Sequence, residues 1–446
     1  MKIYVPSNFH FENLFPNDLK NKDKYCYILH LIEDLRILNK TYEDDDSYVN
    51  IKSKLLEKII GRYIPIRDNL IEKEVIECDN CYKIGEKSKG YRIKKKYRIA
   101  KINTHEITSE KIISNLEIAK NIMIQNIPNE IEYQYLLKNL QKIEIDKSKA
   151  LEFVNSNYSG RNKKIIKKYN LYVRSIRKIY DKNFFIVLDK TGFRVHTNLT
   201  NLFKELRQFL IYKGESLINI DISNSQPFLF NMLIKKYLKD KNKENEYFFS
   251  SLDSFSSLDF FSSLDTNKYK SDNVNNYINP LAYNKFLSII TYVRQNEDIL
   301  IYEKLTSEGK FYEYLMEKME IDKNERNKFK KQVFGRIFFS TSEKSKKRQY
   351  IYWKKFKIHF PSVSEIIEYY KKDNYQQLAV ELQKSESNIM INKVVRRIAI
   401  EKPNIFVSTI HDSILTTIDN QDYIKNLIQE EFRNQFNLIP SIKIEY

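Results

Sequence analysis

Two aspartates, each at the end of an apolar segment, could bind metal ions. Residues 217–220 form an apolar, alternating run that ends at Asp221. The largely apolar residues 405–410 precede His411-Asp412, and apolar residues follow again from position 414. Such patterns predict strands. Either aspartate alone would more simply be a solvated or capping residue. A pair of strand-borne carboxylates in a basic chain instead favours a two-metal site, which can catalyse phosphoryl transfer.

A second set of residues could bind a nucleotide. Arg326, Lys330, Phe334 and Phe338 recur every four residues in ERNKFKKQVFGRIFFSTSEK, so on a helix they would share one face. Two cations suit a triphosphate, and two rings suit a base and a sugar. The alternative is a helix that packs its phenylalanines into a core. That alternative leaves the cations on the same stripe unexplained.

The composition agrees with a polyanionic partner and a reducing compartment. Lys and Arg number 76 against 58 Asp and Glu, a formal net charge of +18, although an AT-rich coding sequence would also enrich lysine. Three cysteines cannot form a disulfide framework in 446 residues, and no apolar run has bilayer length, so we expect a cytoplasmic protein without a membrane segment. Cys78 and Cys81 are spaced like half a zinc site, but without a nearby second pair they are more simply a surface turn.

Patterns along the chain indicate two or three domains. Residues 1–105 predict an N-terminal domain with two helices before a basic hairpin, a winged-helix-like order that suits DNA binding and a small packing domain equally well. Residues 106–185 predict a helical, thumb-like region that ends in a basic stretch. Residues 186–446 carry both aspartates, and a low-complexity insertion at 239–276 contains three Phe-Ser-Ser-Leu-Asp repeats.

The basic residues of these two regions could follow a phosphate backbone, or they could simply lie on solvated faces. In the hairpin they are Lys87, Lys89, Arg92 and Lys94 to Lys96, and in the later stretch they are Arg161, Lys163, Lys164, Lys167, Lys168, Arg174, Arg177 and Lys178.

The segments that carry the aspartates and the cation–aromatic stripe resemble, in this order, motifs A, B and C of the family A DNA polymerases. Asp221-Ile-Ser-Asn-Ser-Gln226 resembles motif A, residues 326–338 resemble the motif B pattern R-x-x-x-K-x-x-x-F-G-x-x-Y, and His411-Asp412-Ser413 resembles motif C. TGFRVHTNLTNLFKELR and ELQKSESNIMINKVV are similar to primer-side and template-side segments of this family. The resemblance covers about residues 185–446. It implies an α+β right-hand polymerase with an antiparallel palm sheet, helical fingers around residues 280–390 and a helical thumb.

The resemblance also implies a role for each matching residue. Asp221 and Asp412, with the backbone carbonyl of Ile222, would bind two Mg²⁺ ions, for which Mn²⁺ can substitute. Lys330 would donate a proton to pyrophosphate. The implied nucleotide-binding residues are Arg326, Lys330, Phe334, Phe338 and Gln226, and the implied DNA contacts are Arg194, Gln383 and His411. The implied partners are primer-template DNA and deoxynucleoside triphosphates (dNTPs).

Three positions depart from the family pattern. Gln226 stands where a glutamate usually excludes the ribose 2′ hydroxyl, Phe338 replaces a tyrosine, and Ser413 replaces a glutamate. Serine after the motif C aspartate is shared with phage-type single-subunit RNA polymerases, but those enzymes have a small residue at the position of Gln226. Because glutamine keeps the bulk of glutamate, we expect deoxynucleotides to be the substrates.

The chain lacks an early strand with the Asp-x-Glu pair of a proofreading exonuclease, so we expect a DNA polymerase without proofreading. Its compact architecture suggests a mobile element, phage or defence locus as its context. Two alternatives stay open: a polymerase or primase that uses ribonucleotides, and a DNA-binding replication initiator with an inactive palm. The presence of Asp221, Asp412, Arg326 and Lys330 argues against the initiator, because such residues are lost first when activity is lost.

Overall fold

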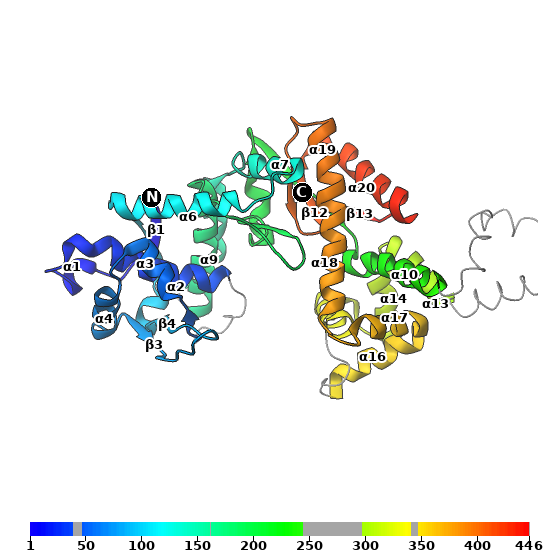
Figure 1. Ribbon diagram of the computed structural model, residues 1–446, viewed down its shortest axis with the longest axis horizontal. Coiled ribbons are helices and arrows are strands. Elements are labelled where there is room, and N and C mark those ends of the chain that lie inside the picture. Colours follow the sequence, from blue (N-terminus) through cyan, green and yellow to red (C-terminus); the bar gives the residue numbers. More distant parts are fainter. Residues whose placement is uncertain (39–46, 161, 244–296, 340–346, 446) are drawn as a thin grey trace, which may run out of the picture.

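The computed structural model describes residues 1–38, 47–160, 162–243, 297–339 and 347–445 (Figure 1). An N-terminal unit lies at one end of the molecule, an antiparallel sheet lies near the middle, and a group of helices lies at the other end (Figure 1). Within the described ranges, no helix combines the length and the apolar character needed to cross a membrane. The Phe-Ser-Ser-Leu-Asp repeats and most of the insertion expected at 239–276 lie outside the described residues.

The N-terminal unit has a hydrophobic core of its own, built from residues between Ile3 and Ile112. Its first and last strands pair with each other, so the two ends of the unit lie together. Three short strands form a second sheet in the order β2-β4-β3. Two helices followed by an antiparallel hairpin, as expected from the sequence, are present. The elements are β1 (Lys2–Pro6), α1 (Phe11–Leu14), α2 (Lys22–Leu38), β2 (Val49–Asn50), α3 (Ser53–Ile60), α4 (Ile64–Glu72), β3 (Ile76–Cys78), β4 (Gly90–Ile93), α5 (Lys95–Arg98) and β5 (Ile102–Glu106).

The next region is mainly helical, as predicted, but it is continuous with the central part of the molecule. Tyr172, Val173 and Ile176 of its last helix are buried in the same core as the central sheet. A short strand of the region, β6, joins that sheet through β9. The elements are α6 (Glu110–Gln125), α7 (Ile131–Leu140), β6 (Glu144–Ile145), α8 (Lys147–Asn157) and α9 (Lys163–Tyr180), followed by the hairpin of β7 (Ile186–Leu188) and β8 (Val195–Thr197).

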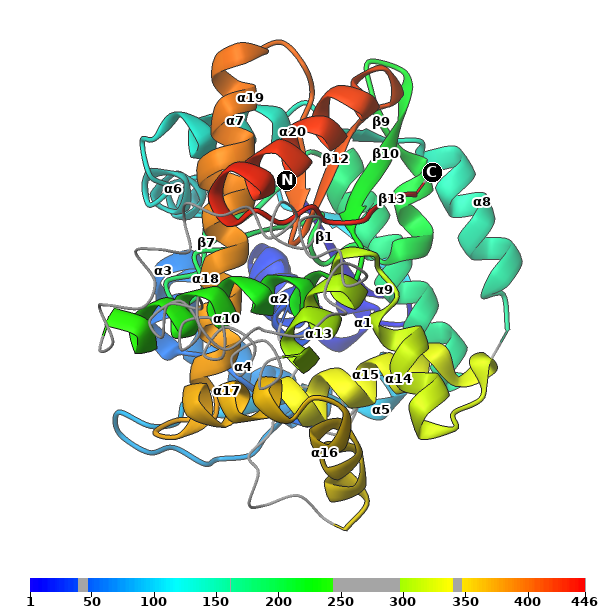
Figure 2. The ribbon, with the colours of Figure 1, turned by 90° about the vertical axis from the view of Figure 1, so that its right-hand side faces the viewer.

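The central sheet has six strands in the order β11-β12-β10-β9-β6, with β13 also paired to β10. All of these pairs are antiparallel. The turn between β9 and β10 consists of Lys213 and Gly214, both with positive φ, which suits the right-handed twist of a hairpin. Helix α20 (Gln421–Phe436) packs against β10 and crosses the sheet in Figure 2. The remaining strands are β9 (Leu210–Tyr212), β10 (Glu215–Ile222), β11 (Ser408–Ile410), β12 (Ser413–Thr417) and β13 (Ile442–Glu445).

Helices make up the described part of the region expected to form the fingers. The longest continuous helical segment begins with α18 (Gln377–Ile389) and continues through the π-helical segment η6 (Met390–Val395) into α19 (Arg396–Glu401). It connects the group of helices to the sheet (Figures 1 and 2). The other helices of this region are α13 (Glu297–Ser307), α14 (Phe311–Met319), α15 (Arg326–Val333), the π-helical segment η5 (Phe334–Phe338), α16 (Lys347–His359) and α17 (Pro361–Lys371). Helix α10 (Ser225–Lys243) precedes this region and packs against α18. The chain is therefore of the expected α+β class, with an antiparallel sheet.

Candidate functional site

The central sheet brings the two predicted metal ligands together. Asp221 on β10 lies directly opposite Ser413 on β12. Ile410 and Ser413 are themselves partners across the β11–β12 hairpin, so His411 and Asp412 form its two-residue turn. His411 has a φ of 56°, the left-handed conformation that this kind of turn requires. Asp412 therefore projects from the end of the sheet next to Asp221.

The electrostatics of this pair fit a cation site. Burial, followed by the charges of Asp412 and Glu445, raises the pKa of Asp221 to about 7. Glu445 has counter-ions, since it pairs with Lys204 at 2.7 Å and with Lys443 at 2.8 Å. Among the residues that the structure describes, no Lys, Arg or His forms an ion pair with Asp221 or Asp412. Two adjacent acids without a direct ion pair are stabilised by a bound metal ion.

The donor atoms are suited to Mg²⁺, which prefers hard oxygen ligands and usually keeps several water or phosphate ligands. Asp221 and Asp412 supply carboxylates, and the backbone carbonyl of Ile222 follows Asp221 on β10. The described residues contain no group of three or more His, Cys, Asp or Glu side chains that could hold a metal ion. Two carboxylates would therefore leave most of the coordination to water and to a phosphorylated substrate.

The two predicted cations lie on α15. Lys330 is exposed, and its charge lowers the pKa of Asp221, so it belongs to the same electrostatic environment. Its Nζ lies 5.6 Å from the centroid of the Tyr312 ring. Arg326 donates from Nε to the Glu313 carboxylate at 2.7 Å, in a pair whose side chains are each about half exposed.

The expected single face of this helix is interrupted, which corrects the expectation of one continuous α-helical stripe. Helix α15 ends at Val333, and residues Phe334–Phe338 have π-helical geometry. A π-helix has more residues per turn, so spacing by four no longer keeps side chains on one face. Phe338 is fully buried, with its ring 5.8 Å from that of Phe230, and its role in nucleotide binding stays a prediction. The side chain of Phe334 lies outside the described part of the structure.

Gln226 occupies the first turn of α10, close to the end of β10 that carries Asp221. Its side chain is buried, and its Nε2 donates to Oε2 of Glu386 on α18 at 2.7 Å. Phe230, one helical turn later, is the residue that contacts Phe338. The residue expected to select the sugar is therefore fixed between the sheet and two helices.

The three expected DNA contacts lie around the β7–β8 hairpin. Arg194 follows Gly192 in the hairpin loop, and a Cβ at Gly192 would lie only 2.6 Å from Oε1 of Gln383, so glycine permits the loop to approach α18. The ring of His411 lies 6.0 Å from that of His196 on β8. The structure thus gathers Arg194, Gln383 and His411 at one place, although they are far apart in the sequence.

Sequence reasoning missed Glu386, the residue that holds Arg194. Nε and Nη2 of Arg194 donate to the two carboxylate oxygens of Glu386 at 2.8 and 2.5 Å. A DNA contact by Arg194 must therefore use its remaining N–H groups or exchange this pair. Glu386 lies in a predicted helical segment that contains both polar and apolar residues. Nothing in its local sequence distinguishes it from an exposed glutamate.

Much of the expected basic surface is neutralised within the protein. Arg174 is buried, and Arg174 and Lys178 pair with Asp34 of α2 at 3.1 and 2.6 Å, so these cations attach α9 to the N-terminal unit. This corrects the expectation of a continuous phosphate-binding stripe, whose first member, Arg161, lies outside the described residues. In the hairpin, Arg92 and Lys94 pair with Glu77, and Lys87 pairs with Asp79.

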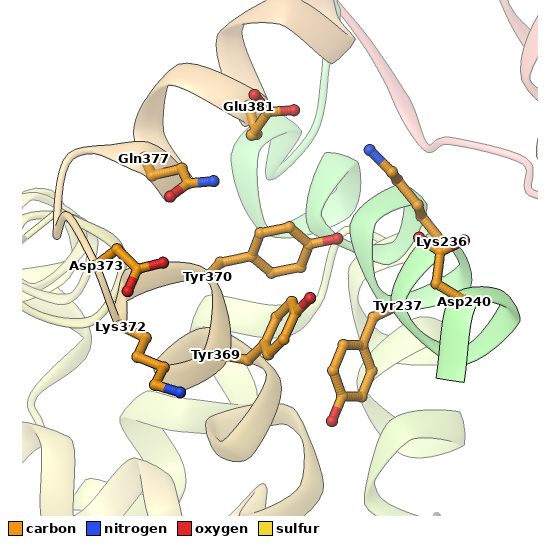
Figure 3. Close-up of a pocket in the computed structure, with 9 residues that line it drawn as sticks. All are labelled: Lys236, Tyr237, Asp240, Tyr369, Tyr370, Lys372, Asp373, Gln377 and Glu381. Carbon is orange, nitrogen blue, oxygen red and sulfur yellow. The ribbon is translucent and has the colours of Figure 1, made fainter. Parts of the chain in front are cut away.

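A cavity of about 660 Å³ lies away from the aspartates, between α10, α17 and α18 (Figure 3). Tyr237, Tyr369 and Tyr370 contribute rings to it, and the ring centroids of Tyr237 and Tyr369 are 4.8 Å apart. Its charged lining includes two lysines and three carboxylates, so charge does not favour an anion there. We assign no part of the nucleotide site to this cavity.

Among solved structures, the chain is similar to the POL domain of Pol1 from M. smegmatis, determined in a complex with DNA primer-template and dNTP. The two chains are 11% identical, and the superposition has a TM-score of 0.39. It covers 68% of this chain and 55% of the other, so this chain spans little more than half of that structure. Comparisons with protein-family models and with curated proteins give no match. A similarity of this size does not define an activity.

Proposed function

We propose that this chain is a template-directed DNA polymerase, a compact and divergent relative of family A, that adds deoxynucleotides to a primer 3′ end by two-metal phosphoryl transfer. The observation that carries the proposal is the pair of adjacent aspartates, Asp221 and Asp412, at the end of an antiparallel sheet and without an ion-pair partner among the described residues. When bound there, two Mg²⁺ ions would activate the primer hydroxyl and stabilise the leaving pyrophosphate.

The cations of α15 would act on the triphosphate. Lys330 is exposed and its charge acts on Asp221, which supports a role as the proton donor to pyrophosphate. Arg326 is held by Glu313 in a surface ion pair, and such pairs contribute only about 0–1 kcal/mol. Arg326 can therefore exchange Glu313 for a phosphate at little cost.

The properties of Gln226 favour the assignment of deoxynucleotides, and not ribonucleotides, as substrates. Its buried side chain keeps the bulk that would exclude a 2′ hydroxyl, and its hydrogen bond to Glu386 restrains it. An enzyme that uses ribonucleotides, as a primase does, is the alternative that a direct comparison of the two nucleotide classes would reveal.

The surrounding elements support a right-hand arrangement. In this proposal, the central sheet is the palm, α13 to α18 form the fingers, and residues 106–185 form a thumb-like region. The order α2, β2, α3, α4, β3, β4, with sheet order β2-β4-β3, supports a winged-helix-like domain in residues 1–105. Exposed lysines of that domain, such as Lys95 and Lys96, could contact DNA. The proposed enzyme has no proofreading activity.

Extension of a labelled primer on a DNA template tests this function. The reaction should require Mg²⁺ or Mn²⁺, proceed with dNTPs and disappear in Asp412→Ala. Extension with ribonucleotides alone would make the ribonucleotide-using enzyme the correct assignment. Tight duplex binding without extension by either nucleotide class would instead support the replication initiator.

A further inference from the structure

One buried carboxylate connects the primer side of the site with the residue expected to select the sugar. The side chain of Glu386 is 2% exposed. Its oxygens accept two hydrogen bonds from Arg194, and Oε2 also accepts one from Nε2 of Gln226 at 2.7 Å. Arg194 lies in the β7–β8 loop, Gln226 at the start of α10 and Glu386 in the last turn of α18, so Glu386 joins three separate elements.

The charge state of Glu386 determines which way the Gln226 amide faces. Burial, and then the charge of Asp412, raises the pKa of Glu386 to about 7, whereas Arg194 opposes this shift. The guanidinium of Arg194 can only donate, and its two hydrogen bonds, one to each carboxylate oxygen, favour the ionised, acceptor-only form of Glu386. An acceptor-only partner can bind only the NH₂ group of Gln226.

The other end of this amide has no hydrogen-bond partner among the described residues. Oε1 of Gln226 is buried and forms no hydrogen bond with any residue that the structure describes. A buried acceptor left in this state is destabilising, and such exceptions need a functional explanation. Because its NH₂ group is held by Glu386, Gln226 presents this oxygen in a fixed direction.

No other described group is placed to hold the amide in this way. Phe338, which meets Phe230 one turn after Gln226, has no hydroxyl group, so it cannot donate a hydrogen bond to Oε1 or accept one from Nε2. Without Glu386 the glutamine could change rotamer or reverse its amide. Either movement would alter the shape that Gln226 offers to a sugar.

We propose that Glu386 is a positioning residue for sugar selection, which acts by fixing Gln226 as a rigid wall while it holds Arg194 on the primer side. This inference rests on the proposed polymerase function. Glu386 does not itself touch the nucleotide, so removing it should change the discrimination between sugars through Gln226 and not through the metal ligands.

The test is single-nucleotide insertion with a dNTP and with the matching ribonucleotide. We expect Glu386→Ala to lower the dNTP-to-ribonucleotide ratio of kcat/KM by about tenfold, the effect of one hydrogen bond to a charged group. In a Gln226→Ala background, the same substitution should produce no further change in this ratio, since residues that act through one another are not additive. An unchanged ratio in folded Glu386→Ala, or an equal fall in both backgrounds, would overturn the proposal.

Two controls separate this role from a purely structural one. Glu381→Ala removes a carboxylate from the same helix, but Glu381 pairs with Lys384 and lines the cavity of Figure 3, so the ratio should not change. If Glu386→Ala does not fold, Glu386→Gln serves as a second variant, because it keeps the side-chain volume. Because glutamine can both donate and accept, it no longer dictates the orientation of Gln226, and the ratio should fall by about threefold or more. An unchanged ratio in Glu386→Gln would also reject the proposal.

The wild-type protein separates the two possible failures. If it extends no primer with either nucleotide class, the proposed function itself is wrong. If it extends primers and discriminates between the sugars, but the Glu386 variants discriminate equally well, only the positioning role of Glu386 is wrong.

Discussion

Asp221 and Asp412 lie side by side because Ser413, which follows Asp412, is the direct cross-strand partner of Asp221. The position of Asp412 therefore depends on the tight β11–β12 turn and on the register between β10 and β12. A shift of the register by one residue would move the side chains of a strand to the opposite face of the sheet. The geometry of the candidate metal site is thus fixed by backbone pairing and not by a flexible loop.

We predict that Asp221→Asn and Asp412→Asn each lower Mg²⁺-dependent extension by at least about 100-fold, because the loss of metal-based stabilisation amounts to several kcal/mol. Both variants should remain folded, since neither carboxylate has an ion pair to lose among the described residues. Addition of Mg²⁺ with a dNTP should raise the melting temperature of the wild type but not of the variants. Asp419→Asn, at an exposed position shortly after β12, is the matched control. Equal extension by the wild type and all three variants would show that the proposed metal site is wrong.

Lys330→Ala should lower kcat by about 100-fold with little change in KM, because loss of a general acid typically costs at least this much. Lys331→Ala is the control, since Lys331 is the exposed neighbour on the same helix. Single-turnover insertion, which isolates the chemical step, is the measurement. A rise in KM without a change in kcat would show that Lys330 binds the nucleotide and does not transfer a proton.

Arg326→Ala should raise the KM for dNTPs by about tenfold, because it removes a charge-assisted contact with phosphate. Glu313→Gln should have the opposite effect or none, since it releases Arg326 from its surface ion pair. Steady-state KM values for the two variants distinguish the roles. A higher KM in Glu313→Gln would mean that the pair itself orders the helix for binding.

The sequence was sufficient to predict the strand–turn–strand segment around Asp412 and the helical region after α10, because both follow local periodicity. The continuous α-helical stripe was predicted wrongly, because a four-residue repeat does not reveal the change from α to π geometry at Phe334. Arg174 was placed wrongly because its partner, Asp34, lies 140 positions earlier in the chain. Glu386 was missed for the same reason, since its partners Arg194 and Gln226 are 192 and 160 positions away. Tertiary ion pairs of this kind depend on the completed fold.

The contact between α2 and α9 should make the protein sensitive to acid. His30 is buried, and its Nδ1 accepts the backbone N–H of Tyr4 at 3.2 Å, which requires the neutral ring. Burial lowers the pKa of His30 to about 4, against the opposing charge of Asp34. A depressed folded-state pKa means that the unfolded chain binds the proton more readily. The stabilisation from neutral His30 is therefore complete above about pH 6.5 and is lost as the pH falls toward 4.

We predict that the free energy of unfolding of the wild type falls by up to about 3 kcal/mol over this interval because of His30, as a pKa difference of one unit corresponds to 1.36 kcal/mol. His30→Gln should be less stable than the wild type at pH 7.5, but its stability should decline less between pH 6.5 and 4.5. His10→Gln, which removes an exposed histidine from the same unit, should follow the wild type. Urea unfolding at several pH values measures these differences, and the same decline in wild type and His30→Gln would show that His30 does not cause the acid sensitivity.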